Sequence, residues 1–139
     1  MSDPQADCEK LLGLVIPFAE QMLAENGEFY PFGAAMAPDG ELSAVSAYDG
    51  QEHPRAEEVI EFLKEALQDG ARGGRYIATA LAYDARISLP SGGASDAVTV
   101  LLDHRDDLSL IVQFPYRRED GAVSFDPPIS QNGGSDIFL

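Results

Sequence analysis

The residues of this chain best suited to chemistry are its two histidines and the aspartates next to one of them. His104 lies in the run 103–107 (Asp-His-Arg-Asp-Asp), where an imidazole beside carboxylates can move protons or bind a small ligand. The run also separates two apolar segments, and a turn alone explains two successive aspartates. His53 precedes a predicted helix, which a neutral imidazole can cap. The ligand candidates are therefore His53, Asp103, His104, Asp106 and Asp107, and we predict no catalytic residue.

No pattern in the chain matches a common arrangement for a metal or a nucleotide. One cysteine and two separated histidines give no zinc framework, and the aspartate spacing does not follow that of a calcium-binding loop. The stretch 91–95 (Ser-Gly-Gly-Ala-Ser) lacks the lysine and the following helix of a phosphate-binding loop. No Gly-x-Ser-x-Gly nucleophile turn is present. We therefore expect neither a metal nor a cofactor.

The chain is strongly acidic, with 24 Asp and Glu against 9 Lys and Arg and a formal net charge of −15. This charge repels a phosphate backbone, so we exclude nucleic acid as a partner. It favours cationic proteins, although a solvated acidic surface suited to high salt gives the same composition. No apolar run approaches the ~20 residues that span a bilayer, and the N-terminus lacks the basic start of a secretory signal. We therefore expect a cytoplasmic protein without membrane association.

Cys8 is the single cysteine of the chain, which excludes an internal disulfide and agrees with a cytoplasmic location. It falls on the apolar stripe of the first predicted helix. A thiol in that position is typically buried and inert rather than reactive. We therefore expect Cys8 to contribute to the core.

Apolar residues recur at three- and four-residue steps in two segments, which is the pattern of amphipathic helices. The first helix is capped by Asp3 or Ser2 and ends at Asn26-Gly27. Leu14 and Ile16 fall outside its main stripe, so they either widen the buried face or contact a partner. The second helix spans about residues 54–69.

Strands are predicted in the rest of the chain. The strands 29–37 and 41–48 flank the turn Pro38-Asp39-Gly40, and further strands are expected within 75–89, 97–102, 108–116 and 122–125, followed by an irregular tail, 126–139. We predict one α+β domain over residues 1–139, with the order α-β-β-α-β-β-β(-β). Both helices pack on one face of a mostly antiparallel sheet of five or six strands.

The predicted strands 97–102 and 108–116 are apolar on both faces, since Val98 and Val100 alternate with apolar neighbours such as Leu101. With both helices on one face, the other face must meet the tail residues 137–139 or another subunit, because monomers seldom expose so large an apolar patch. We therefore expect a homodimer.

Aromatic side chains concentrate on the first hairpin, and they are Phe29, Tyr30, Phe32 and Tyr48. Core packing explains them, but on a bare face they would anchor a partner. We interpret the chain as a non-enzymatic acidic module that binds a protein partner of basic character, as an immunity-like or chaperone-like binder would. Two alternatives stay open: a small-ligand-binding protein or enzyme with a pocket near His104, and a homodimeric structural domain.

Overall fold

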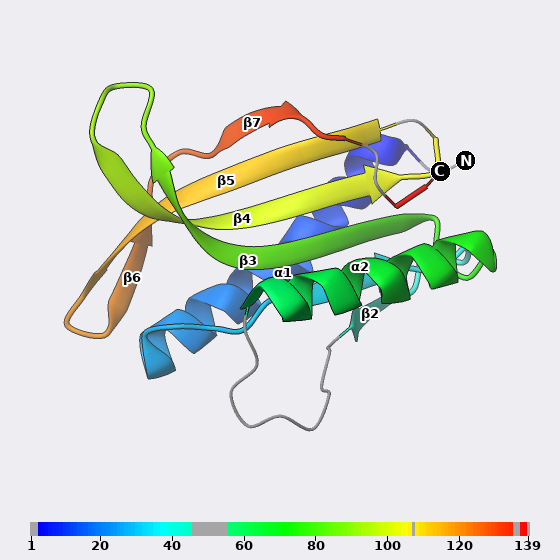
Figure 1. Cartoon of the computed structure of the whole chain (residues 1–139), viewed down its shortest axis with the longest axis horizontal. Coiled ribbons are helices and arrows are strands. Elements are labelled where there is room, and N and C mark those ends of the chain that lie inside the picture. Colours follow the sequence, from blue (N-terminus) through cyan, green and yellow to red (C-terminus); the bar gives the residue numbers. More distant parts are fainter. Residues whose placement is uncertain (1–2, 46–55, 107, 135–136, 139) are drawn as a thin grey trace.

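The structure, a computed structural model, describes residues 3–45, 56–106, 108–134, 137 and 138. Two helices and seven strands form an α+β fold, which confirms the predicted class (Figure 1). The helices are α1 (Pro4–Asn26) and α2 (Ala56–Arg72). The strands are β1 (Phe32–Met36), β2 (Leu42–Val45), β3 (Ala78–Ser88), β4 (Ala94–His104), β5 (Leu108–Glu119), β6 (Ala122–Phe125) and β7 (Ile129–Asn132).

The ends of α1 follow from its capping residues. The Asp3 carboxylate accepts a hydrogen bond from the backbone N–H of Gln5, and a proline occupies the first turn, where its missing N–H is not needed. At the other end Gly27 adopts the left-handed backbone (φ 76°), and its N–H donates to the carbonyl oxygen of Leu23. Both predicted helix ends are therefore confirmed.

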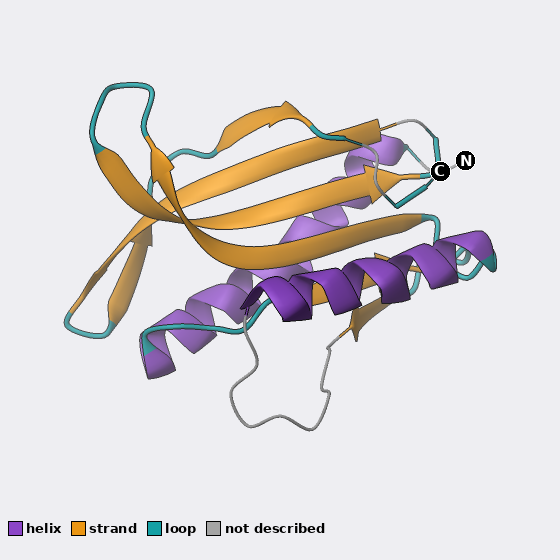
Figure 2. Cartoon of the chain, in the orientation of Figure 1, coloured by secondary structure: helices purple, strands orange, loops and turns teal. Residues whose placement is uncertain are grey.

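The strands form one antiparallel sheet in the order β2-β1-β3-β4-β5-β6, and β7 pairs with β5 (Figure 2). The sheet has seven strands rather than five or six, because the tail expected to be irregular contains β7. The predicted turn between β1 and β2 is confirmed. Gly40 has a positive φ (89°), and the Asp39 carboxylate accepts the N–H of Glu41.

The two helices lie on opposite faces of the sheet, so the prediction that both cover one face is wrong (Figure 1). Ala34 and Val100 belong to the hydrophobic cluster under α1, whereas their chain neighbours Ala35 and Leu101 belong to the cluster under α2. Successive side chains of a strand point to opposite faces. Strands that are apolar on both faces are typical of a sheet buried on both sides, and an apolar stripe on a helix does not indicate which side it covers.

The C-terminal segment packs on the same face as α2. Ile137 is buried in the cluster of α2, and Phe138 packs against that cluster. The predicted cover by the tail is therefore confirmed for these two residues, and Leu139 lies outside the described residues. The homodimer prediction assumed a face without a helix, and that premise is wrong, so the oligomeric state stays a prediction.

Candidate functional site

His104 is buried, and it joins α1 to the end of the sheet. Its Nε2 lies 2.9 Å from Oδ2 of Asp7 in the first turn of α1, and the two side chains are 0% and 6% exposed. The backbone N–H of Asp106 donates to Nδ1 at 3.0 Å, so the imidazole proton resides on Nε2 and is donated to Asp7. We call Asp7 and His104 the buried anchor. A substrate has no access to this imidazole.

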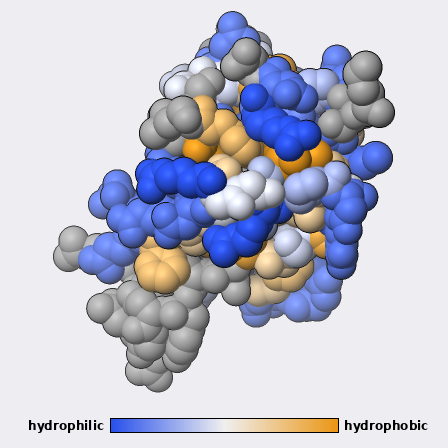
Figure 3. All heavy atoms as spheres, turned by 90° about the vertical axis from the view of Figure 1, so that its right-hand side faces the viewer, coloured by the Kyte–Doolittle hydropathy of each residue, from blue (hydrophilic) through white to orange (hydrophobic). Residues whose placement is uncertain are grey.

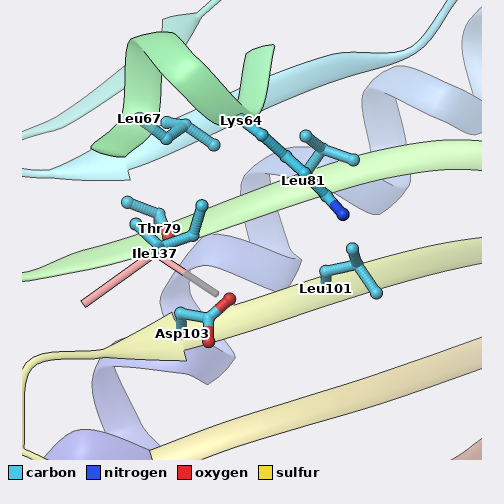
Figure 4. Close-up of a pocket in the computed structure, with 7 residues that line it drawn as sticks. All are labelled: Lys64, Leu67, Thr79, Leu81, Leu101, Asp103 and Ile137. Carbon is cyan, nitrogen blue, oxygen red and sulfur yellow. The ribbon is translucent and has the colours of Figure 1, made fainter. Parts of the chain in front are cut away.

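Asp103 points to the opposite face of the sheet from His104, toward α2 (Figure 4). Its carboxylate accepts a hydrogen bond of 2.8 Å from the hydroxyl of Ser109. It lines a cavity of about 10 Å³, which is about the room that one water molecule needs. The cavity is too small for a substrate, and the residues around it are Lys64, Leu67, Thr79, Leu81, Leu101, Asp103 and Ile137.

Of the remaining ligand candidates, Asp106 is the one that the structure describes. The Asp106 side chain is 54% exposed, with its Oδ2 3.8 Å from Nδ1 of the imidazole. His53 and Asp107 lie outside the described residues. The structure therefore brings His104 together with Asp7, from the other end of the sequence, and gives a pocket near His104 no support.

Cys8 is buried in α1 next to the anchor, as predicted. Burial, with the carboxylates of Asp7 and Asp103 adding to its effect, raises the pKa of the Cys8 thiol to about 11. The thiolate is the reactive form of cysteine, so at neutral pH this side chain is an unreactive part of the core.

Three of the nine basic residues line an open groove of about 440 Å³ near the C-terminal end of α1. Arg86 and Arg117 each pair with a carboxylate, at 3.2 and 3.6 Å. Arg118 donates from Nε to the carbonyl oxygen of Leu23, at the helix end where the dipole favours a cation. These contacts account for the arginines as structural residues, and the groove does not make an anion site.

A phenol–carboxylate pair beside this groove connects β3 with β5. The Tyr116 hydroxyl donates to the carboxylate of Asp84, at 2.9 and 3.0 Å from its two oxygens. Burial raises the pKa of Asp84, and the hydrogen bond from Tyr116 opposes that change. Burial, followed by Asp84 itself, also raises the pKa of Tyr116. Sequence reasoning missed this pair, because the two residues meet only through the register of three strands.

The four predicted aromatic anchors differ in exposure. Phe29 and Phe32 are 8% and 9% exposed and belong to the core, whereas Tyr30 is 53% exposed. Tyr48 lies outside the described residues. The ring of Phe32 meets that of Phe18 edge to face, with 4.8 Å between the centroids. Core packing is therefore the main role of Phe29 and Phe32. Phe32 also contacts the exposed ring of Phe18.

An apolar groove lies between α1 and the strands β1 and β2. It has a volume of about 210 Å³ and is lined by Leu14, Phe18, Phe32, Gly33, Ala34, Ala44 and Val45, which we call the α1–β2 groove. Leu14 and Phe18 are 37% and 48% exposed. Exposed apolar surface gathered in a hollow is typical of a binding site rather than of a solvated surface.

Sequence reasoning found this groove only in part. The sequence pattern places Leu14 outside the stripe of α1, but it does not single out Phe18. The two residues are four apart, which puts them on one face of the helix. The spacing of Leu14 and Phe18 was the signal in the sequence that could have identified this face of the helix.

Most of the negative charge lies in the N-terminal half of the sequence, which also contains all the lining residues of this groove. Residues 1–65 hold 14 acidic and 3 basic residues, a net charge of −11, whereas residues 66–139 hold 10 and 6, a net charge of −4. Glu57, Glu58 and Glu61 are exposed on α2. Figure 3, seen from the right-hand side of Figure 1, shows that hydrophilic residues cover much of that end of the molecule.

Within the described residues, no three His, Cys, Asp or Glu side chains gather so as to hold a metal ion. Neither described helix is long and apolar enough to cross a membrane. Comparisons with protein-family models, curated proteins and solved structures give no match. The function is therefore inferred from the geometry of the molecule alone.

Proposed function

We propose that this protein is a non-enzymatic interaction module that binds a protein partner of basic character through the α1–β2 groove. The observation that carries the proposal is the pair Leu14 and Phe18, half-exposed over an apolar hollow of about 210 Å³. An aromatic ring beside a hollow is the kind of residue that supplies most of the energy of an interface.

Electrostatics sets the character of the partner. The groove is apolar, but the sequence around it carries a net charge of −11 over residues 1–65. Such a field attracts a cationic protein over long range and accelerates its encounter, while apolar contact in the groove slows its release. An inhibitor or chaperone of a basic protein needs this combination. A cytoplasmic location belongs to the same proposal and is supported by Cys8, a free buried thiol.

The test is affinity capture from an extract of the native host by three immobilised proteins: the wild type, Phe18→Gln and Phe62→Gln. Phe62 is the matched control, because it is 49% exposed on α2 as Phe18 is 48% exposed on α1, but it does not line the groove. We expect a basic protein to be retained by the wild type and by Phe62→Gln and to be lost from Phe18→Gln. Its purified form should then bind in a titration that weakens as salt increases.

Equal retention of the partner by Phe18→Gln and by the wild type would contradict the proposal, as would a partner of acidic character. Retention of a second copy of this chain would identify the module as a homodimer, the alternative function. Sedimentation equilibrium of the purified protein in moderate salt measures that outcome directly.

A further inference from the structure

The strand β2 brings an edge of the sheet to the groove. It is the end strand of the described sheet, and only β1 pairs with it there. The N–H of Ala37 donates to the carbonyl oxygen of Glu41 at the hairpin end. Because hydrogen-bonded and non-hydrogen-bonded pairs alternate along an antiparallel ladder, Ser43 then bonds to β1. The N–H and C=O groups of Leu42 and Ala44 consequently point outward.

Ala44 connects this edge with the groove. It pairs with Ala34 across the β1–β2 ladder, and both side chains line the groove. The backbone of Ala44 therefore faces outward while its side chain contributes to the groove. A strand added along β2 would place every second side chain on the face that holds the groove.

The other side chains of an added strand would project on the opposite face of the sheet, where α2 lies. Val45, on β2, packs against the hydrophobic cluster of α2. The exposed residues of α2 include Glu57, Glu58 and Glu61. Side chains on this face therefore lie on the same side of the sheet as these carboxylates.

We propose that the occupant of the groove is an extended segment of the partner that adds to β2 as a further strand, with apolar residues alternating with Lys or Arg. The apolar residues enter the α1–β2 groove, and the basic residues face the acidic side of α2. Backbone hydrogen bonds to Leu42 and Ala44 supply affinity, and the alternation supplies specificity. This inference rests on the proposed function and names the chemistry and conformation of the bound segment.

The probe is a short fluorescein-labelled peptide that alternates valine and lysine, titrated with the protein by fluorescence anisotropy. Control peptides alternate valine and glutamate, or carry the same valines and lysines in two blocks. A further control has N-methyl groups on alternate peptide bonds along the edge that would face β2. We expect saturable binding of the alternating Val-Lys peptide only, because each control lacks the charge, the alternation or the N–H donors.

Two substitutions at one position test the edge of the protein itself. Ala44→Pro removes the outward N–H and leaves the bonds to β1 in place, and proline is tolerated on edge strands. Ala44→Thr keeps the N–H and serves as the control. We expect Ala44→Pro to bind about tenfold more weakly than Ala44→Thr, the effect of a lost hydrogen bond of ~1.4 kcal/mol, because both variants enlarge the side chain in the groove and only proline removes the N–H.

The outcomes separate this inference from the proposed function. Loss of peptide binding in Phe18→Gln with full binding in Ala44→Pro would overturn strand addition and leave the groove as the binding site. Tight binding of the N-methylated peptide would overturn it as well, whether or not Ala44→Pro folds. Equal binding of the alternating and block peptides, or no saturable binding of any peptide, would overturn the inferred segment, whereas capture by Phe18→Gln overturns the proposed function.

Discussion

The buried anchor and the α1–β2 groove lie along the same helix and differ in every property that matters for function. The anchor joins two titratable side chains at 2.9 Å, with 0% and 6% of each exposed. The groove is built of apolar residues, three of which, Leu14, Phe18 and Ala44, are exposed. The side chains that could transfer protons are buried in the fold. Apolar side chains, which cannot, line the accessible groove.

This difference shows why residue type alone is a poor guide to the site. A histidine between aspartates suggests catalysis or ligand binding, but His104 uses both nitrogens to hold α1 and the β4–β5 turn together. Leucine and phenylalanine on a helix suggest core, but Leu14 and Phe18 are 37% and 48% exposed and line the α1–β2 groove. In this molecule, exposure rather than chemical type distinguishes the residues of the proposed binding site from those that hold the fold together.

The largest expected change in stability comes from substitution in the buried anchor. His104→Ala should lower the free energy of unfolding by about 3 kcal/mol, because the carboxylate of Asp7 is left buried without its donor. Urea denaturation measures this loss. Asp106→Ala is the control, since its side chain is 54% exposed, and it should cost less than about 1 kcal/mol. A loss below that value for His104→Ala would show that the anchor does not hold α1 in place.

A second expected effect is on the pH dependence of stability, and it comes from Cys8, next to the buried anchor. Its pKa is raised from 9.0 to about 11 in the fold, so the folded state disfavours the thiolate. The stability from this group is complete below pH 9 and is lost as the pH rises through 11, with a total loss of about 3 kcal/mol. Cys8→Ala should therefore lose less stability than the wild type between about pH 8 and pH 10.5. Parallel losses for the two proteins would contradict the burial of this thiol.

A smaller change in the free energy of unfolding, an increase, is expected at Thr99 on the face of the sheet that α2 covers. The hydroxyl of Thr99 is buried without a hydrogen-bond partner among the described residues. Thr99→Val keeps the shape of the side chain and removes the unpaired hydroxyl, so it should raise the free energy of unfolding by about 1 kcal/mol. Ser109→Ala, which removes the donor to Asp103, should change stability in the other direction. Thermal denaturation of both variants decides the signs.

Local features of the fold were predictable from sequence. The caps of α1, the turn at Pro38-Asp39-Gly40 and the short strand β6 depend on neighbouring residues, and all were found where the sequence placed them. The sheet is apolar on both faces, so either helix could cover either face. The sequence of a single helix or strand therefore does not predict which face each helix covers.

The candidate site was less predictable for the same reason. Phe32 was recognised as an aromatic anchor and does line the groove, but Phe18, Gly33 and Ala44 come from three different elements. Their meeting depends on where α1 crosses the sheet. The contact of Asp7 with His104 likewise spans 97 positions of sequence, and local patterns carry no information about it.

Hydrogen–deuterium exchange of the protein with and without the alternating valine–lysine peptide tests the central claim most directly. We expect slower exchange at the amides of Leu42 and Ala44 when the peptide is bound, because those outward N–H groups become hydrogen-bonded. The amides next to the buried anchor should exchange at the same rate in both samples. Protection confined to the opposite edge of the sheet, at β6 and β7, or to the arginine-lined groove would contradict the assignment of the α1–β2 groove as the binding site.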